Sequence, residues 1–152
     1  MATEDIVRWL RSEHGGTHQL ADPLRKTVAT SPRGGRAQWI AELQTRFDGY
    51  AGHVCRRMVE EEERGYLKPV LEARPSLAGA AEVLQHEHVE LTRLIDRLRR
   101  SVRQLTPMDN LLLRDCGKRI ENLLSWVERH EEHENHIVLY AFAEGAGTHA
   151  PA

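Results

Sequence analysis

The chain has 152 residues, of which 40% are hydrophobic and 29% charged, and its formal net charge is -2. This length is sufficient for one domain with its own core, and the composition is typical of a globular rather than a disordered protein. The small net charge gives no reason to expect nucleic acid or a membrane surface as a partner. The acidic N-terminus lacks the apolar run of a signal peptide, and no segment approaches the roughly 18 apolar residues of a membrane span. We therefore expect a cytoplasmic protein.

Apolar residues recur at alternating intervals of three and four along four segments, a spacing typical of helices that face a bundle core. The first segment covers residues 7–28. The glycine pair at 15–16 and Pro23 predict a kink or an interruption within it, because proline cannot donate a helical hydrogen bond.

The next two segments are separated by clear turn signals. The second helix is expected to start near Arg36 and to stop or bend at Gly65, followed by a short continuation over 66–73. Ser76 is a candidate N-cap for the third helix, which has its apolar stripe within 84–105. The Thr-Pro pair at 106–107 is expected to open the fourth helix, because proline is tolerated in the first turn.

The two halves of the chain resemble each other. Leu-Arg-Ser-Glu-His at 10–14 matches Leu-Gln-His-Glu-His at 84–88, and a weaker similarity relates the second helix to the fourth. Two helical hairpins related by duplication predict an all-α fold, an up-and-down antiparallel four-helix bundle. We expect residues 1–145 to form this bundle and residues 146–152 to form a flexible tail.

Histidine is unusually frequent, with nine residues, and three histidines lie where the apolar pattern reserves a core position. These are His14, His88 and His130, the last with Glu134 four residues later on the same helix face. An ionised carboxylate in a dry core is costly unless it is paired or bound to a cation. Since histidine is also the commonest metal ligand, the pattern indicates a metal site inside the bundle.

A fourth histidine is expected at the same depth. Measured from the end of the bundle that they share, His14, His53, His88 and His130 lie about 15 to 20 Å along their helices. An up-and-down bundle would therefore bring one histidine from each helix into one layer.

With these motifs the chain resembles the hemerythrin-like family of HHE cation-binding domains over nearly its whole length. The resemblance rests on Glu-His at 13–14 and 87–88, on Glu-Glu-Glu-Arg-Gly-Tyr-Leu at 61–67, and on His-Glu-Glu-His-Glu-Asn at 130–135. Members of the family hold a non-haem di-iron centre. One histidine comes from each odd helix and a His-x-x-x-Glu pair from each even helix. The resemblance implies metal ligands at these positions: His14, Glu61, His88, His130 and Glu134.

The second helix departs from the family pattern. Arg57 stands four residues before Glu61, where the family has histidine, and His53 lies one further turn away. The axial distance from His53 to Glu61 is about 12 Å, too far for one helix to direct both easily at the same ion. Either His53 substitutes as a ligand with a shifted glutamate, or Arg57 pairs with Glu61 and replaces one metal. The second alternative leaves a mononuclear or an empty site.

The resemblance implies non-haem iron as the cofactor, as one ion or two, with O₂ or another small ligand bound there. The leading interpretation is a domain that binds O₂ or senses oxygen, redox state or iron. The sequence is also compatible with a homodimer or with a signalling partner. The runner-up is a di-iron oxidase or peroxidase, although the Glu-x-x-His motif of ferritin-like enzymes is absent. The third is a metal-free interaction module with a buried polar network around Arg57. We assign no catalytic residue.

Overall fold

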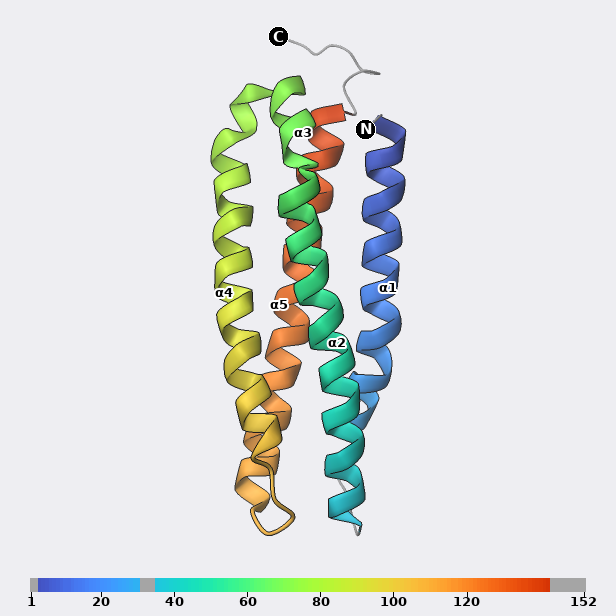
Figure 1. Ribbon diagram of the computed structural model, residues 1–152, viewed down its shortest axis with the longest axis vertical. Helices are drawn as coiled ribbons and strands as arrows, with labels where there is room; N and C mark the ends of the chain where they lie inside the picture. Colours follow the sequence, from blue (N-terminus) through green and yellow to red (C-terminus); the bar gives the residue numbers. More distant parts are fainter. Residues whose placement is uncertain (1–2, 31–34, 143–152) are drawn as a thin grey trace.

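The computed structural model describes residues 3–30 and 35–142, and all the regular secondary structure among them is helical. Four long helices run alternately up and down, so that each is antiparallel to the neighbours against which it packs (Figure 1). They are α1 (Thr3–Ala29), α2 (Arg36–Arg64), α4 (Ala78–Arg103) and α5 (Asn110–Phe142), and α2 is joined to α4 through the short α3 (Leu67–Ala73) and the 3-10 helix η1 (Pro75–Leu77). The predicted all-α bundle is thereby confirmed. The predicted tail, 146–152, lies outside the described residues.

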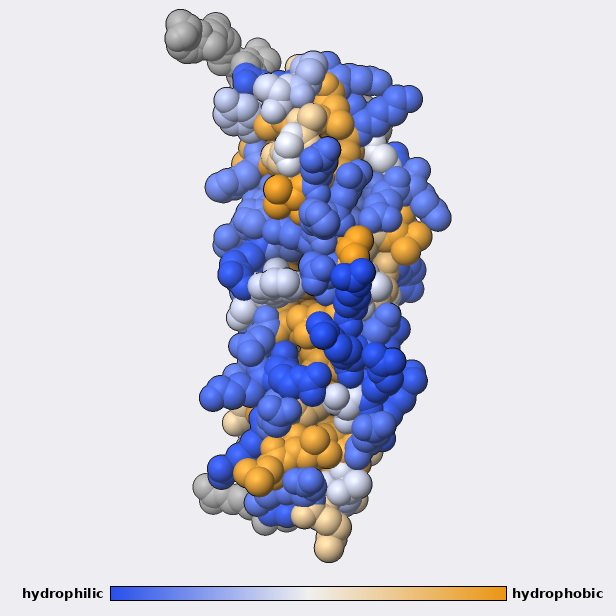
Figure 2. All heavy atoms as spheres, turned by 90° about the vertical axis from the view of Figure 1, so that its left-hand side faces the viewer, coloured by the Kyte–Doolittle hydropathy of each residue, from blue (hydrophilic) through white to orange (hydrophobic). Residues whose placement is uncertain are grey.

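The four long helices form a closed ring. The helix α1 packs against α2 and α5, while α4 packs against α2 and α5 from the other side, and α3 rests on α5. The face formed by α4 is largely hydrophilic, with its apolar groups confined to separate patches (Figure 2). None of the helices among the described residues combines the length and the apolar character that crossing a membrane requires.

The core is divided along the bundle axis into two apolar clusters. The large apolar cluster consists of the buried apolar residues within 21–24, 40–58, 91–105 and 113–127. The small apolar cluster, near the chain ends, consists of Ile6, Leu10, Tyr66, Val70, Leu84, Ile137, Val138 and Ala141. Between them along each helix lies a polar layer of buried side chains, formed by His14, Thr17, Arg57, Glu61, His88, His130, Glu131 and Glu134.

The helix α1 is continuous through the predicted weak points, so of the expected kink or interruption the interruption is wrong. Pro23 lies inside it, and a single proline removes one backbone hydrogen bond without ending a helix that packs along two neighbours. The glycine pair has a packing reason instead. A Cβ added at Gly16 would lie 3.1 Å from Cε1 of His53, so glycine lets the His53 ring approach α1 closely.

Helix ends agree with the sequence prediction where glycine sets them. Gly65 ends α2 in a left-handed conformation with φ of 66°, as expected of a C-cap glycine. The predicted N-cap at Ser76 is wrong, because this residue lies within η1 and no side chain caps the start of α4. The fourth long helix begins at Asn110, later than predicted, where Oδ1 of Asp109 accepts a 2.9 Å hydrogen bond from the Leu112 N–H.

Candidate metal centre

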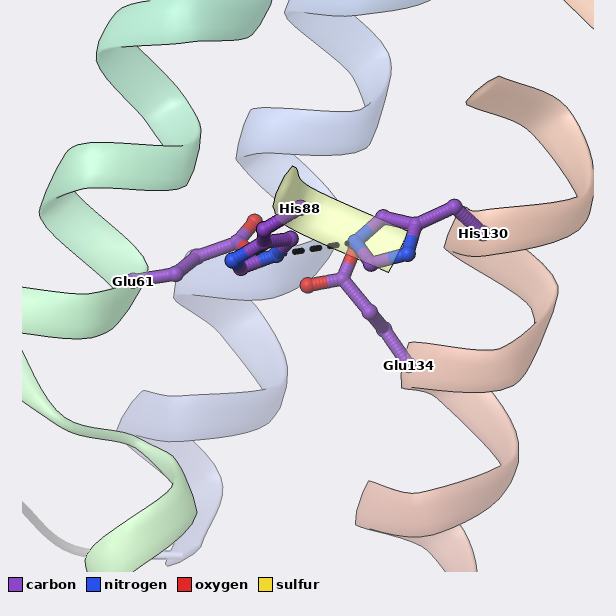
Figure 3. Close-up of side chains that lie close together, drawn as sticks. All are labelled: Glu61, His88, His130 and Glu134. Atoms are coloured by element: carbon purple, nitrogen blue, oxygen red, sulfur yellow. Dashed lines mark hydrogen bonds and ion pairs between the residues drawn. The ribbon is translucent and has the colours of Figure 1, made fainter. Parts of the chain in front are cut away.

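Two histidines and two glutamates converge in the polar layer. Glu61 projects from α2, His88 from α4, and His130 and Glu134 from successive turns of α5 (Figure 3). Each offers one ligand atom, and these atoms lie within 4.8 Å of one another. All four residues are buried, with Glu134 at 0% exposure. We call these residues the four-donor group. Imidazole and carboxylate donors together suit first-row transition metals such as iron.

The two histidine rings of this group face each other through the same kind of nitrogen. The Nε2 atoms of His88 and His130 are 3.0 Å apart (Figure 3). On the outer side, Nδ1 of His88 lies 3.0 Å from Oε1 of Glu62, and Nδ1 of His130 lies 2.7 Å from Oε1 of Glu87. A neutral imidazole that donates its Nδ1–H to a carboxylate presents a lone pair at Nε2. Two such lone pairs at this distance repel unless a shared proton or a metal ion lies between them.

Glu61 supplies a second sign that a cation fits here. Neither of its carboxylate oxygens has an aligned hydrogen bond from any of the described residues, and both are buried. Nε of Arg57 lies 3.0 Å from Oε1, and Nε2 of His88 lies 3.0 Å from Oε2. Burial raises the pKa of Glu61 to about 8. A carboxyl group in this state holds a proton until a stronger cation replaces it.

Glu134 is the charged member of the carboxylate pair. Its Oε1 lies 3.3 Å from Nε2 of His14, and its Oε2 accepts a 2.9 Å hydrogen bond from the hydroxyl of Tyr66. Burial opposes its ionisation, but the hydrogen bond with His14, the neighbouring carboxyl of Glu61 and the charges of His130 and Arg57 outweigh burial and hold the pKa of Glu134 well below its usual range. The pKa values of the two carboxyl groups in the four-donor group are thus shifted in opposite directions, upward for Glu61 and downward for Glu134.

Arg57 occupies the other side of the same two glutamates. It is 1% exposed, and its Nη1 donates 2.7 Å hydrogen bonds both to Oγ1 of Thr17 and to Oε2 of Glu131. Its Nη2 lies 3.6 Å from Oε1 of Glu134. Burial alone would lower the pKa of Arg57, but the charges of Glu134, Glu61 and Glu131 outweigh burial and raise it. The guanidinium is therefore a fixed positive charge among three buried carboxylates.

The structure brings together most, but not all, of the predicted ligands. The four-donor group contains four of them, and His14 lies beside it on Glu134. His53 is outside the group, because its Nε2 lies 3.0 Å from Oγ1 of Thr17, two turns of α2 away from Glu61. Of the two alternatives for the second helix, the geometry shows Arg57 paired with Glu61.

Two buried members of this region were not predicted. Glu131 is 3% exposed although it lies off the apolar stripe of the fourth helix, and Tyr66 is 3% exposed in the turn after α2. The signal that could have found Glu131 is Arg57 itself. A buried guanidinium needs more than one carboxylate partner, and Glu61 alone is insufficient.

Solvent approaches the layer from two sides. A cleft of about 750 Å³ between α2, α3 and α4 is lined by Glu61 and His88 at its inner end. A second cleft, of about 550 Å³ between α1 and α5, reaches His14 and Glu131. Each of the two clefts therefore has residues of the polar layer in its lining.

A bundle of antiparallel helices around a buried group of histidines and glutamates defines an all-α domain with a candidate cation site. The profile of the hemerythrin HHE cation binding domain matches residues 5–142. The chain therefore belongs to this family, which confirms the predicted resemblance. No curated protein and no solved structure was found to match the chain.

Proposed function

We propose that this domain binds iron in the four-donor group and uses it to bind O₂ or to sense oxygen, redox state or iron. The observation that supports it best is the pair of facing imidazoles, whose Nε2 atoms are 3.0 Å apart while each Nδ1 lies against a carboxylate. A neutral imidazole that donates its Nδ1–H to this carboxylate directs the Nε2 lone pair inward, toward a metal ion. The two buried glutamates offer the negative charge that a ferrous or ferric ion requires.

The side chains around the group have distinct roles in this proposal. Glu62 and Glu87 hold the protons on the outer nitrogens of His88 and His130. Tyr66 binds Oε2 of Glu134 and leaves Oε1 directed at the centre. Bound iron would supply redox chemistry and open coordination positions for O₂ or another small ligand. The cleft between α2, α3 and α4 gives such a ligand access.

One observation favours a different function, that of a metal-free interaction module. Arg57 places a permanent positive charge among three buried carboxylates, which is a partly satisfied network without any ion. In that case the facing histidines would share a proton instead of a metal. The oxidase or peroxidase alternative differs from both, because it requires turnover in addition to binding.

The test is iron binding by the intact chain. Protein loaded anaerobically with ferrous iron and then desalted is expected to retain iron, measured by elemental analysis. The double variant His88→Ala/His130→Ala is expected to lose the bound iron. The control variant His86→Ala, which replaces an exposed histidine on the same helix as His88, is expected to retain iron. A change in the visible spectrum on adding O₂ or nitric oxide would support an open position. Retention no greater than that of the double variant would favour the metal-free module.

A further inference from the structure

Within the described part of the chain, the buried glutamates of the polar layer face two cation positions. One lies among the ligand atoms of the four-donor group, and the other is filled by the guanidinium of Arg57. We infer that Arg57 is a resident cation that takes the place of a second metal ion, so that the layer accepts one metal ion per chain. This inference rests on the proposed metal-binding function and specifies its stoichiometry.

The two positions share their carboxylates. Glu61 directs Oε1 to Nε of Arg57 and Oε2 to Nε2 of His88, each at 3.0 Å. Oε1 of Glu134 lies 3.6 Å from Nη2 of Arg57 and 3.6 Å from Nε2 of His130. Both glutamates therefore lie between the guanidinium of Arg57 and the imidazole nitrogens of the four-donor group, and a metal ion in that group would share them with Arg57 as paired metal ions share bridging carboxylates. Here one of the two centres belongs to the protein.

Charge in the layer also favours a single ion. Glu61, Glu131 and Glu134 contribute three negative charges when all are ionised, and Arg57 contributes one positive charge. Two negative charges then remain, which one divalent cation neutralises. A second divalent cation would leave an excess of positive charge in a buried layer, and uncompensated buried charge is strongly unfavourable.

Contacts outside the four-donor group keep the guanidinium of Arg57 in this position. Its Nη1 binds Oγ1 of Thr17 and Oε2 of Glu131, both at 2.7 Å, and neither partner belongs to the four-donor group. Glu131 is fixed in turn by Nε2 of His18 at 3.0 Å. A guanidinium also remains protonated at every accessible pH, whereas a histidine at the same position can lose its proton and bind a metal.

The contacts of Arg57 indicate which atoms the imidazole of a histidine at position 57 would reach. Nε2 of histidine is the same number of bonds from Cα as Nε of arginine, the atom that lies 3.0 Å from Oε1 of Glu61. His14 already lies 3.3 Å from Oε1 of Glu134. The imidazole introduced by Arg57→His would join His14, Glu61 and Glu134 and provide a second set of two histidines and two shared carboxylates.

The stoichiometry of ferrous iron, loaded anaerobically into the full chain and measured by elemental analysis, tests this inference. We expect about one ion for the wild type, about two for Arg57→His, and about one for Arg57→His/His14→Ala. The matched control Arg57→Lys keeps the positive charge and is expected to bind about one. Two ions in the wild type, or one in a folded Arg57→His variant, would overturn the inference while leaving the proposed function intact. No ion in the wild type would overturn both.

If Arg57→His fails to fold, the number of bound metal ions can still be measured on the wild type. Mn²⁺ is used as the probe, because an isolated Mn²⁺ ion and an exchange-coupled pair have different electron paramagnetic resonance spectra. We expect about one Mn²⁺ per chain, with the spectrum of an isolated ion. A coupled spectrum with about two Mn²⁺ per chain would contradict a resident cation at Arg57.

Discussion

The large apolar cluster and the polar layer are adjacent sections of one bundle, yet they are stable for different reasons. The cluster consists of side chains such as Phe47, Ile95 and Leu98, each 0% exposed, that contribute mainly through the apolar area they bury. The polar layer buries Arg57 and Glu134 just as completely, at 1% and 0% exposure. Its stability depends on each charged group keeping its partner.

This difference determines how each region responds to change. Removing one apolar side chain leaves a cavity, and the neighbours relax partly into it. Removing one charged side chain from the layer leaves several partners buried without compensation. The layer is also the region that a bound cation would stabilise, because a ligand that binds only the folded state adds to its stability. The apolar cluster should be indifferent to metal.

The largest effect is expected from removing the charge at the centre of the layer. Arg57→Met keeps much of the side-chain volume but leaves Glu61, Glu131 and Glu134 without the guanidinium. We expect the metal-free protein to lose about 3 to 5 kcal/mol of unfolding free energy. Urea denaturation followed by circular dichroism measures this loss.

A second substitution separates lost charge balance from lost packing. In Arg57→Met/Glu131→Gln, one of the uncompensated carboxylates is neutralised, so part of the stability should return. If the single variant loses less than about 1 kcal/mol, the layer tolerates unpaired carboxylates and the contrast with the apolar cluster is wrong.

A loss that is no larger, and that is independent of metal, is expected in the large apolar cluster. Leu98→Ala removes a fully buried side chain and should cost roughly 2 to 5 kcal/mol. Urea denaturation with and without bound metal should give the same loss, because Leu98 contacts the apolar cluster and lies outside the polar layer. A change of tenfold or more in metal affinity would show that the two regions are coupled.

The same contrast explains what the sequence could predict. The apolar spacing identified the four long helices, and the polar residues predicted at core positions of the fourth helix, His130 and Glu134, are buried. The helical spacing of apolar residues is sufficient to identify these helices, because the large apolar cluster requires only apolar side chains on one face of each helix. Helix starts were less predictable, because the start of α5 depends on one side-chain contact, in which the Leu112 N–H donates to Oδ1 of Asp109.

Residues of the candidate site that occupy apolar-stripe positions of their own helix were predicted. A residue that is buried through a contact with another helix was not. His88, His130 and Glu134 occupy stripe positions that an apolar residue would fill, so their pattern identified them. Glu131 lies off the stripe and becomes buried because Arg57 of α2 binds it across the core. His53 shared the right depth, but depth does not fix direction, and its ring lies over α1 beside Gly16.

Glu87 contacts a histidine of the four-donor group from outside the polar layer, and its loss should affect metal binding more than folding. Glu87 accepts from Nδ1 of His130 at 2.7 Å and is partly exposed, at 27% for its side chain. We expect Glu87→Ala to weaken metal affinity by about 10- to 100-fold, because the ring loses the partner that fixes its tautomer. Metal titration measures the change, and Glu82→Ala, an exposed glutamate on the same helix, serves as the control. Equal affinities for the two variants would contradict a role for Glu87.

The smallest effect is expected at the boundary between the layer and the small apolar cluster. The ring of Tyr66 belongs to the cluster, whereas its hydroxyl donates to Oε2 of Glu134 at 2.9 Å. Tyr66→Phe keeps the ring and removes one of the hydrogen bonds to this carboxylate, so we expect a loss of about 1 kcal/mol. Tyr140→Phe, at an exposed tyrosine, should change stability by less than about 0.5 kcal/mol. Urea denaturation of both variants decides whether the hydroxyl matters, since equal losses would mean that Glu134 depends on His14 and Arg57 and that Tyr66 contributes only as an apolar ring.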